Sequence, residues 1–122
     1  MSDNHGTADS LHELREQLRH FAAERDWQQF HSPKNLAIAL SVEAAELLEI
    51  FQWLSEDASR QLAAEQRAHA SEELADVLLY LVKLADELGV DLVAAAGEKV
   101  ATNAFRYPVA KARGTSRKHS DL

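Results

Sequence analysis

The sequence contains no cysteine among its 122 residues and has only four Gly and two Pro. Without thiols the chain can form no disulfide and no thiolate metal site. Sparse Gly and Pro favour a few long helices over many short strands. Outside the helical runs there is also no sustained alternation of apolar and polar residues, which is the pattern of a strand. We therefore expect an all-α fold.

Long apolar runs and basic charge are also scarce. The longest apolar run, Val77 to Val82, is far too short to cross a bilayer, and Met1 to Ala8 is polar and unlike a signal peptide. The net charge of −7 disfavours a nucleic-acid binder, which needs a basic face to displace counterions. These features predict a cytoplasmic protein that binds neither nucleic acid nor membrane.

Helical periodicity dominates the rest of the chain. Start signals lie at Ser10 (with Glu13), at Ser32-Pro33 and at Asp91, and Gly89 and Pro108 are stop signals. The pattern predicts helices over about 10–26, 33–54, 69–88 and 91–105, with room for a short helix within 55–66. Short connections favour a four-helix bundle, in which an apolar stripe left exposed on each helix would favour a homodimer or homotetramer. We expect a disordered lead-in at 1–9, one domain over 10–108 and a basic tail at 109–122.

Two acidic pairs with the spacing i, i+3 stand out, Glu43/Glu46 and Glu73/Asp76. With about 100° per residue, Glu43 falls inside the apolar stripe of its helix, and Glu73 lies at the edge of the stripe on the next long helix. A carboxylate in an apolar stripe is costly unless it is neutralised, paired or bound to metal. We expect the two helices to bring all four carboxylates to one point.

Acid-x-x-acid pairs are common on solvated helix faces, so placement is what distinguishes these two. Four carboxylates without cysteine suit oxygen-preferring cations, Mg²⁺ first and Mn²⁺ as a substitute. A di-iron bundle would use Glu-x-x-His pairs, and none occurs in the sequence. Because Mg²⁺ usually binds through a few carboxylates together with substrate phosphates, the pattern predicts phosphate chemistry.

A phosphorylated ligand needs donors for its phosphates and a surface for its base. Candidate donors are Lys83, Lys99, Asn103 and Arg106, of which Lys99 and Asn103 lie one turn apart on one helix face. Candidate stacking residues are Trp27, Trp53 and Tyr80, because aromatic faces stack nucleobases. Each of these side chains alone is more often an ordinary surface or packing residue.

Taken in order along the chain, these residues resemble the all-α nucleoside triphosphate pyrophosphohydrolases, the MazG-like group, and most closely the dCTP pyrophosphatases. The resemblance covers roughly residues 10–118. It rests on the following segments: Phe21 to His31, Pro33 to Leu36, Glu43 to Leu47, Phe51 to Trp53, Glu72 to Leu81, Lys99, Asn103, Arg106 to Pro108, and Ser116 to Lys118.

The resemblance implies hydrolysis between the α- and β-phosphates of a nucleoside triphosphate, with Mg²⁺ held by Glu43, Glu46, Glu73 and Asp76. It further implies phosphate or sugar contacts from Lys34, with Asn35 beside it, and from Lys99, Asn103 and Arg106, and nucleoside contacts from Trp27, Trp53 and Tyr80. One position departs from the pattern: the animal dCTP enzymes have a histidine three residues before the Phe, where this chain has Leu18. The alternative function is a helical module that binds nucleotide or metal without turnover.

Overall fold

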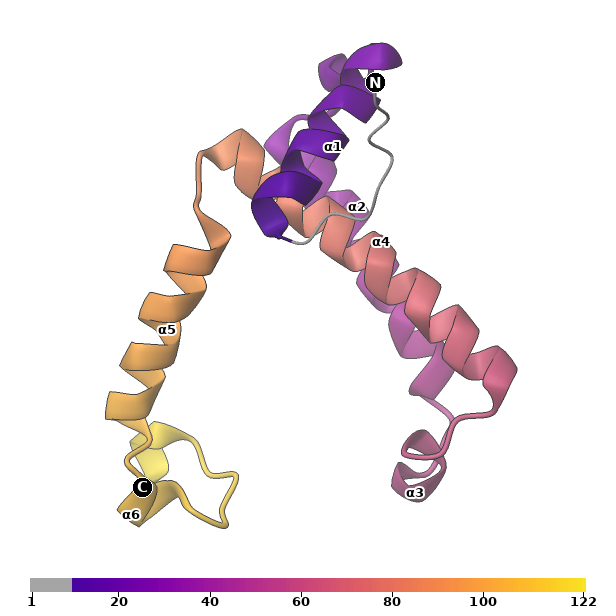
Figure 1. Cartoon of the computed structure of the whole chain (residues 1–122). Coiled ribbons are helices and arrows are strands. Elements are labelled where there is room, and N and C mark those ends of the chain that lie inside the picture. The colour runs from indigo at the N-terminus through magenta and orange to yellow at the C-terminus, as the bar shows by residue number, and fades with distance from the viewer. Residues whose placement is uncertain (1–9) are drawn as a thin grey trace. The chain divides into compact units, whose positions relative to one another are not determined.

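The computed structural model describes residues 10–122, so the predicted lead-in at 1–9 lies outside the described residues. Within that range every regular element is helical and no strand occurs, which confirms the all-α prediction (Figure 1). In chain order the elements are α1 (Leu11–Glu24), η1 (Gln28–Phe30), α2 (Pro33–Phe51), α3 (Glu56–Ser59), α4 (Ala64–Leu88), α5 (Leu92–Arg106), α6 (Val109–Ala112) and η2 (His119–Asp121).

Three predicted start signals cap helices as expected. The Ser10 hydroxyl accepts a hydrogen bond from the backbone N–H of Glu13 (3.1 Å), and the Ser32 hydroxyl accepts one from Asn35 (3.1 Å). Asp91 Oδ1 does the same for Ala94 (3.0 Å). Each bond satisfies one of the backbone donors that a helix leaves free at its first turn.

The start of α4 differs from the prediction, since the helix begins at Ala64 rather than near His69. Its N-cap is Ala63, which has no side-chain acceptor, so the usual start signal is missing. Instead the Gln66 side chain accepts a hydrogen bond from the Ala63 backbone N–H (3.0 Å). As a result His69 lies more than one turn inside the helix. The ends of α1 and α2 also come slightly earlier than predicted, at Glu24 and Phe51.

The chain divides into two compact units, 1–89 and 90–122, which are described separately. In the described part of the first unit, α2 packs along α4, and α1 packs against α4 as well. The apolar side chains buried there are Ala22, Leu36, Ala70, Val82 and Ala85. The second unit contains α5, α6 and η2, where Tyr107 meets His119 edge to face. The four-helix bundle, the 10–108 domain and the 109–122 tail stay predictions.

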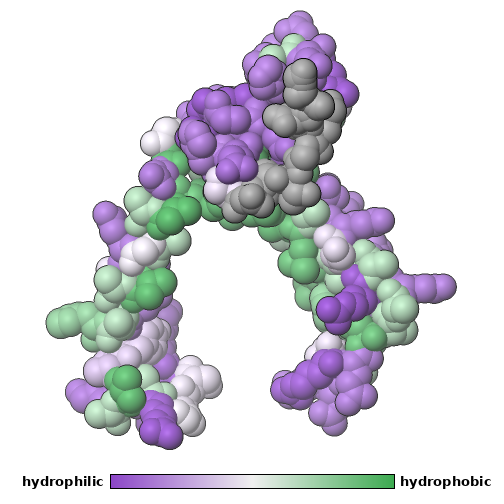
Figure 2. Space-filling view, viewed as in Figure 1, coloured by the Kyte–Doolittle hydropathy of each residue, from purple (hydrophilic) through white to green (hydrophobic). Residues whose placement is uncertain are grey.

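Many large apolar side chains remain at the surface of both units, where Figure 2 shows hydrophobic patches among the polar residues. The predicted stripe of α4 consists of Leu74, Val77, Leu78, Leu81, Leu84, Ala85 and Leu88. Of these residues Ala85 is buried, whereas Leu74 and Leu88 are each more than half exposed, and Val82, outside the predicted stripe, is buried as well. The described residues of one copy therefore leave much of the predicted stripe uncovered. Among these residues no helix is long and apolar enough to span a membrane.

Candidate metal centre

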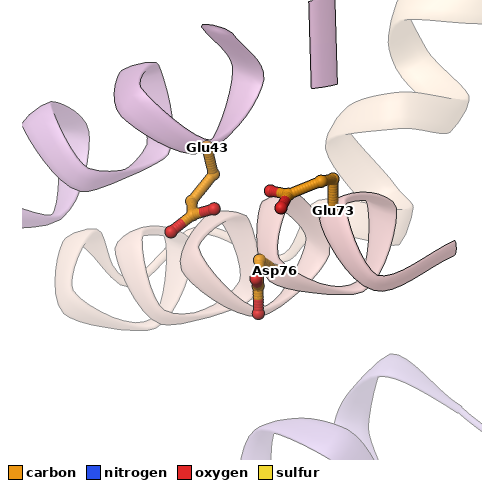
Figure 3. Close-up of side chains that lie close together, drawn as sticks. All are labelled: Glu43, Glu73 and Asp76. Carbon is orange, nitrogen blue, oxygen red and sulfur yellow. The ribbon is translucent and has the colours of Figure 1, made fainter. Parts of the chain in front are cut away.

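Three carboxylates meet where α2 packs on α4. One oxygen from each of Glu43, Glu73 and Asp76 lies within 4.8 Å of the others. Figure 3 shows Glu43 reaching from α2 toward α4, with the Glu73 carboxylate pointing back at it and Asp76 beside them. Glu73 and Asp76 share a face of α4 because they are three residues apart. The packing of two helices thus collects three negative side chains at one place.

Two oxygens of this triad are buried and lack a hydrogen-bond partner, Glu43 Oε2 and Glu73 Oε2. Glu73 is also the one buried charged residue among residues 10–122, with 8% of its surface exposed. The helical wheel predicted the reverse order, with Glu43 embedded and Glu73 at an edge. A helical wheel gives the angular position of a residue on its own helix but not which neighbouring helix covers it. Here α2 packs over the edge of the α4 stripe, so Glu73 is buried.

Burial together with the neighbouring acidic groups raises the pKa of Glu43 to about 7. Burial is the largest cause, followed by hydrogen bonding with Glu46 and Glu73 and by the negative charges of Glu46 and Asp76. A carboxyl group in this position binds either a proton or a cation near neutral pH. The triad therefore has the electrostatic character of a cation site.

Glu46 differs from the other three predicted ligands. Its carboxylate interacts with Glu43 but does not belong to the triad. Since Glu46 lies one turn after Glu43 and about 60° around the helix, its side chain approaches the site from one side. The prediction that four carboxylates meet at one point is therefore met by three in this structure, with the fourth alongside Glu43.

Sequence reasoning did not single out His69, which contacts the triad. His69 Nε2 lies 3.4 Å from Glu73 Oε1, one turn earlier on α4. The sequence does contain the signal, a His and a Glu with the spacing i, i+4. That signal has meaning only if His69 is inside the helix, and the predicted start of this helix placed it at the boundary.

A pocket of about 250 Å³ lies further along the first unit, between α1, η1 and the end of α4. Its lining includes Leu18, His31 and Lys83. Burial lowers the pKa of the Lys83 ammonium, and burial together with the Lys83 charge lowers the pKa of His31. Lys83 is two turns beyond Asp76 on the same face of α4, ~10 Å along the helix axis. The position that departs from the dCTP enzymes, Leu18, thus lines a pocket that contains both basic and acidic side chains, Lys83 and Asp86 among them.

The predicted stacking residues lie in different places. Trp27 packs edge to face against Phe21 and His31, with ring centroids 5.6 and 6.5 Å apart. Trp53 follows the other end of α2 and is 85% exposed. Because α2 has 19 residues and is ~28 Å long, the two indoles in one copy do not share a binding surface. Tyr80 is on α4, one turn beyond Asp76 and partly buried.

The remaining predicted ligand contacts are polar side chains outside the triad. Lys34 is exposed in the first turn of α2, and the Asn35 amide donates to the Phe30 carbonyl (3.0 Å), so Asn35 also holds η1 against α2. Lys99, Asn103 and Arg106 are all exposed on α5. These three residues belong to the second unit, whereas the triad belongs to the first.

The donor set fits a hard divalent cation. It consists of carboxylates only, and two of their oxygens are buried without a proton donor. A cation bound between the helices would satisfy both oxygens at once, which no protein donor among residues 10–122 does.

Comparison with known sequences agrees with this chemistry. The sequence pattern of the MazG-like family matches residues 38–122. The chain belongs to the MazG-like family. Among its relatives, dCTP pyrophosphatase 1 from Rattus norvegicus is 48% identical over 93% of this chain and 68% of its own length. The enzyme of the same name from Homo sapiens is 46% identical over the same shares.

A solved structure is also similar, that of a pyrophosphatase from Archaeoglobus fulgidus. It matches with a TM-score of 0.77 and 39% identity, over 87% of this chain and 99% of the other. The resemblance seen in the residue pattern is therefore confirmed, and with it the prediction of an enzyme similar to the dCTP pyrophosphatases.

Proposed function

We propose that this MazG-like protein is a Mg²⁺-dependent nucleoside triphosphate pyrophosphohydrolase. It hydrolyses dCTP or a related deoxynucleoside triphosphate to the monophosphate and pyrophosphate. The observation that carries the proposal is the triad of Glu43, Glu73 and Asp76, with two buried oxygens that no protein group satisfies. The names of the relatives support the choice of dCTP. A role in clearing excess or modified nucleotides would follow from this activity.

The triad would hold Mg²⁺, with Mn²⁺ as a substitute, and Glu46 would complete the ligand set from beside Glu43. The bound cation supplies charge neutralisation for the phosphates and lowers the pKa of a bound water. The chain itself would supply a base: Glu46, which lies beside the triad on α2, is the first candidate, and Glu43 within the triad is the second. Water attacks the α-phosphorus, the bond from this phosphorus to the bridging oxygen breaks, and pyrophosphate leaves.

The other predicted contact residues are assigned to parts of the nucleotide by their chemistry, polar side chains to the phosphates or sugar and aromatic side chains to the nucleoside. Lys34, Lys99, Asn103 and Arg106 would contact phosphates or sugar, and Asn35 would fix the loop before α2. Lys83 lines the pocket two turns from Asp76 and is the candidate donor there. Trp27, Trp53 and Tyr80 would contact the nucleoside.

A homodimer or homotetramer is part of the proposal. Two features support it. Large apolar side chains of both units are exposed, and within one copy the length of α2 separates Trp27, before this helix, from Trp53, after it. A second copy would cover apolar surface and could bring one indole toward the other across the interface. The cytoplasmic location and the absence of nucleic-acid and membrane partners stay predictions.

The test is a panel of the eight ordinary nucleoside and deoxynucleoside triphosphates, assayed with Mg²⁺ and then with Mn²⁺. The proposal predicts monophosphate and pyrophosphate in equal amounts, fastest from dCTP or a closely related deoxynucleotide. Tight nucleotide binding without any monophosphate would contradict it and favour the non-catalytic binding module. Diphosphate and inorganic phosphate as products would place the cleaved bond elsewhere.

A further inference from the structure

The two oxygens of the Glu73 carboxylate have different surroundings. Oε1 lies 3.4 Å from His69 Nε2, whereas Oε2 is buried and has no hydrogen-bond partner. Both oxygens belong to a side chain that is only 11% exposed, so neither can turn freely into solvent. The carboxylate is thus held with one oxygen toward His69 and one toward the interior of the site.

His69 reaches this position because of its place on α4. It lies one turn before Glu73, and its side chain shares a face with Glu73 and Asp76, which follow at i+4 and i+7. The imidazole is 57% exposed, so it sits at the rim of the triad rather than in it. An N–H at Nε2 can therefore approach Glu73 from the solvent side while the other oxygen stays inside.

We propose that His69 is a positioning residue of the metal centre: its Nε2 holds Glu73 Oε1, so that Oε2 faces the bound cation. The inference rests on the metal site proposed above. In metal sites, groups that fix the orientation of a ligating carboxylate or histidine typically change metal affinity about 10–100-fold when removed. A carboxylate held in one orientation loses less conformational freedom on binding a cation than a free one does.

Removing the imidazole separates the positioning role from simple proximity. If the 3.4 Å contact of His69 Nε2 with Oε1 orients the Glu73 carboxylate, replacing His69 by an apolar side chain weakens cation binding. If His69 only lies near the site, the same replacement leaves cation binding unchanged or tightens it.

The experiment measures Mn²⁺ binding to the full chain without nucleotide, by calorimetry and by the electron paramagnetic resonance signal of free Mn²⁺. His69→Leu removes the donor, His69→Gln keeps an N–H at a similar reach, and His20→Leu on α1 is the matched control. We expect His69→Leu to raise the Kd for Mn²⁺ about tenfold. His69→Gln should recover most of the affinity, and His20→Leu should equal the parent.

Three results would overturn the inference: an unchanged or tighter Kd in His69→Leu, or an equal loss in His69→Gln and His69→Leu. The last would mean that imidazole itself is required, as a ligand or for packing. Because His69 is exposed, circular dichroism should show all variants folded. If the parent chain itself does not bind Mn²⁺, the proposed metal site fails and the positioning role fails with it.

Discussion

Arg19 on α1 donates two hydrogen bonds to the carboxylate of Asp86 on α4, one from Nε and one from a terminal nitrogen, and the two residues are 67 positions apart in the sequence. Arg19 Nε donates to Asp86 Oδ2 (2.8 Å) and Nη2 donates to Oδ1. Arg19 also pairs with Glu16 on its own helix (2.9 Å). The two-pronged geometry gives this pair more directional strength than a single surface ion pair has. It lies in the wall of the pocket that Lys83 also lines.

This pair predicts a pH-dependent contribution to stability. The hydrogen bond and charge of Arg19 lower the pKa of Asp86 below its ordinary value of 3.8. A carboxyl group whose pKa is lowered by folding stabilises the protein at pH values above its unfolded pKa, and the effect is lost as the pH falls through the lowered pKa. We expect Asp86→Asn to lower the Tm by a few degrees at pH 7 and to match the parent in strong acid.

The control for this experiment is Asp57→Asn, which breaks an exposed pair with Arg60 on α3. A pair of that kind contributes little to stability. If Asp86→Asn and Asp57→Asn have the same Tm at pH 7, the pair between α1 and α4 is not a structural link.

Glu43 predicts the opposite pH dependence in the absence of metal. Folding raises its pKa from 4.5 to about 7, so between these values the folded protein binds a proton that the unfolded chain does not. The free energy of unfolding therefore falls as the pH rises from about 4.5 to about 7. Above that range the ionised Glu43 carboxylate destabilises the folded state by its full amount. We expect Glu43→Gln to be more stable than the parent at pH 8 in EDTA and to lack this slope.

Adding Mg²⁺ or Mn²⁺ should remove the destabilisation by ionised Glu43 in the parent, because the bound cation replaces the missing proton. Thermal melts at pH 5 and pH 8, with EDTA and with Mg²⁺, measure both effects. A parent protein that is equally stable at pH 5 and pH 8 in EDTA, with no gain from Mg²⁺, would show that the carboxylates do not repel one another.

How far the sequence predicted this structure can be seen at α4. Gly89 marked its end, where the backbone has φ 67°, and the acidic residues lie on the face that the wheel indicated. The start was wrong because Ala63 caps through its backbone and Gln66, and no pattern of cap residues marks that arrangement. The depth of Glu73 was not predictable either, since it depends on where α2 lies across α4 rather than on α4 alone.

The apolar stripes show a second limit of sequence reasoning. Periodicity places Leu74 and Leu88 on the apolar face of α4 together with Ala85, but of these three only Ala85 is buried. A sequence pattern identifies which face of a helix needs a partner and does not identify the partner. The same limit applies to Lys99, Asn103 and Arg106. Their spacing places them on one helix but does not identify the group that they contact.

The oligomer is tested through an exposed apolar residue of α2. Ile38 is 53% exposed, and in an assembly that covers it a buried aspartate would be costly. We expect Ile38→Asp to sediment as a smaller species than the parent while keeping its helical circular dichroism. Gln61→Asp, at an exposed polar position after α3, should leave the sedimentation unchanged. A parent chain that sediments as a monomer would contradict the proposed assembly.

The point of water attack can be read from the products. Hydrolysis in water enriched in ¹⁸O should place one label in the monophosphate, because the attacking oxygen bonds to the α-phosphorus. Mass spectrometry of both products after a single turnover measures this directly. Label in the pyrophosphate would instead show that water attacks the β-phosphorus. That result would contradict the proposed step, in which Glu46 or Glu43 acts as the base for attack at the α-phosphorus.

The most direct test of the triad is the rate of pyrophosphate release from dCTP with Mg²⁺ by Asp76→Asn. This substitution removes one anionic ligand of the proposed metal centre. Glu73→Gln and Glu46→Gln extend the test to two further carboxylates of that centre. The controls are Glu49→Gln and Glu72→Gln, exposed acids on the same two helices. The account predicts that folded Asp76→Asn loses at least about a hundredfold in rate, equivalent to about 2.7 kcal/mol of barrier or more, while the controls match the parent. A folded Asp76→Asn protein that releases pyrophosphate as fast as the parent would contradict it.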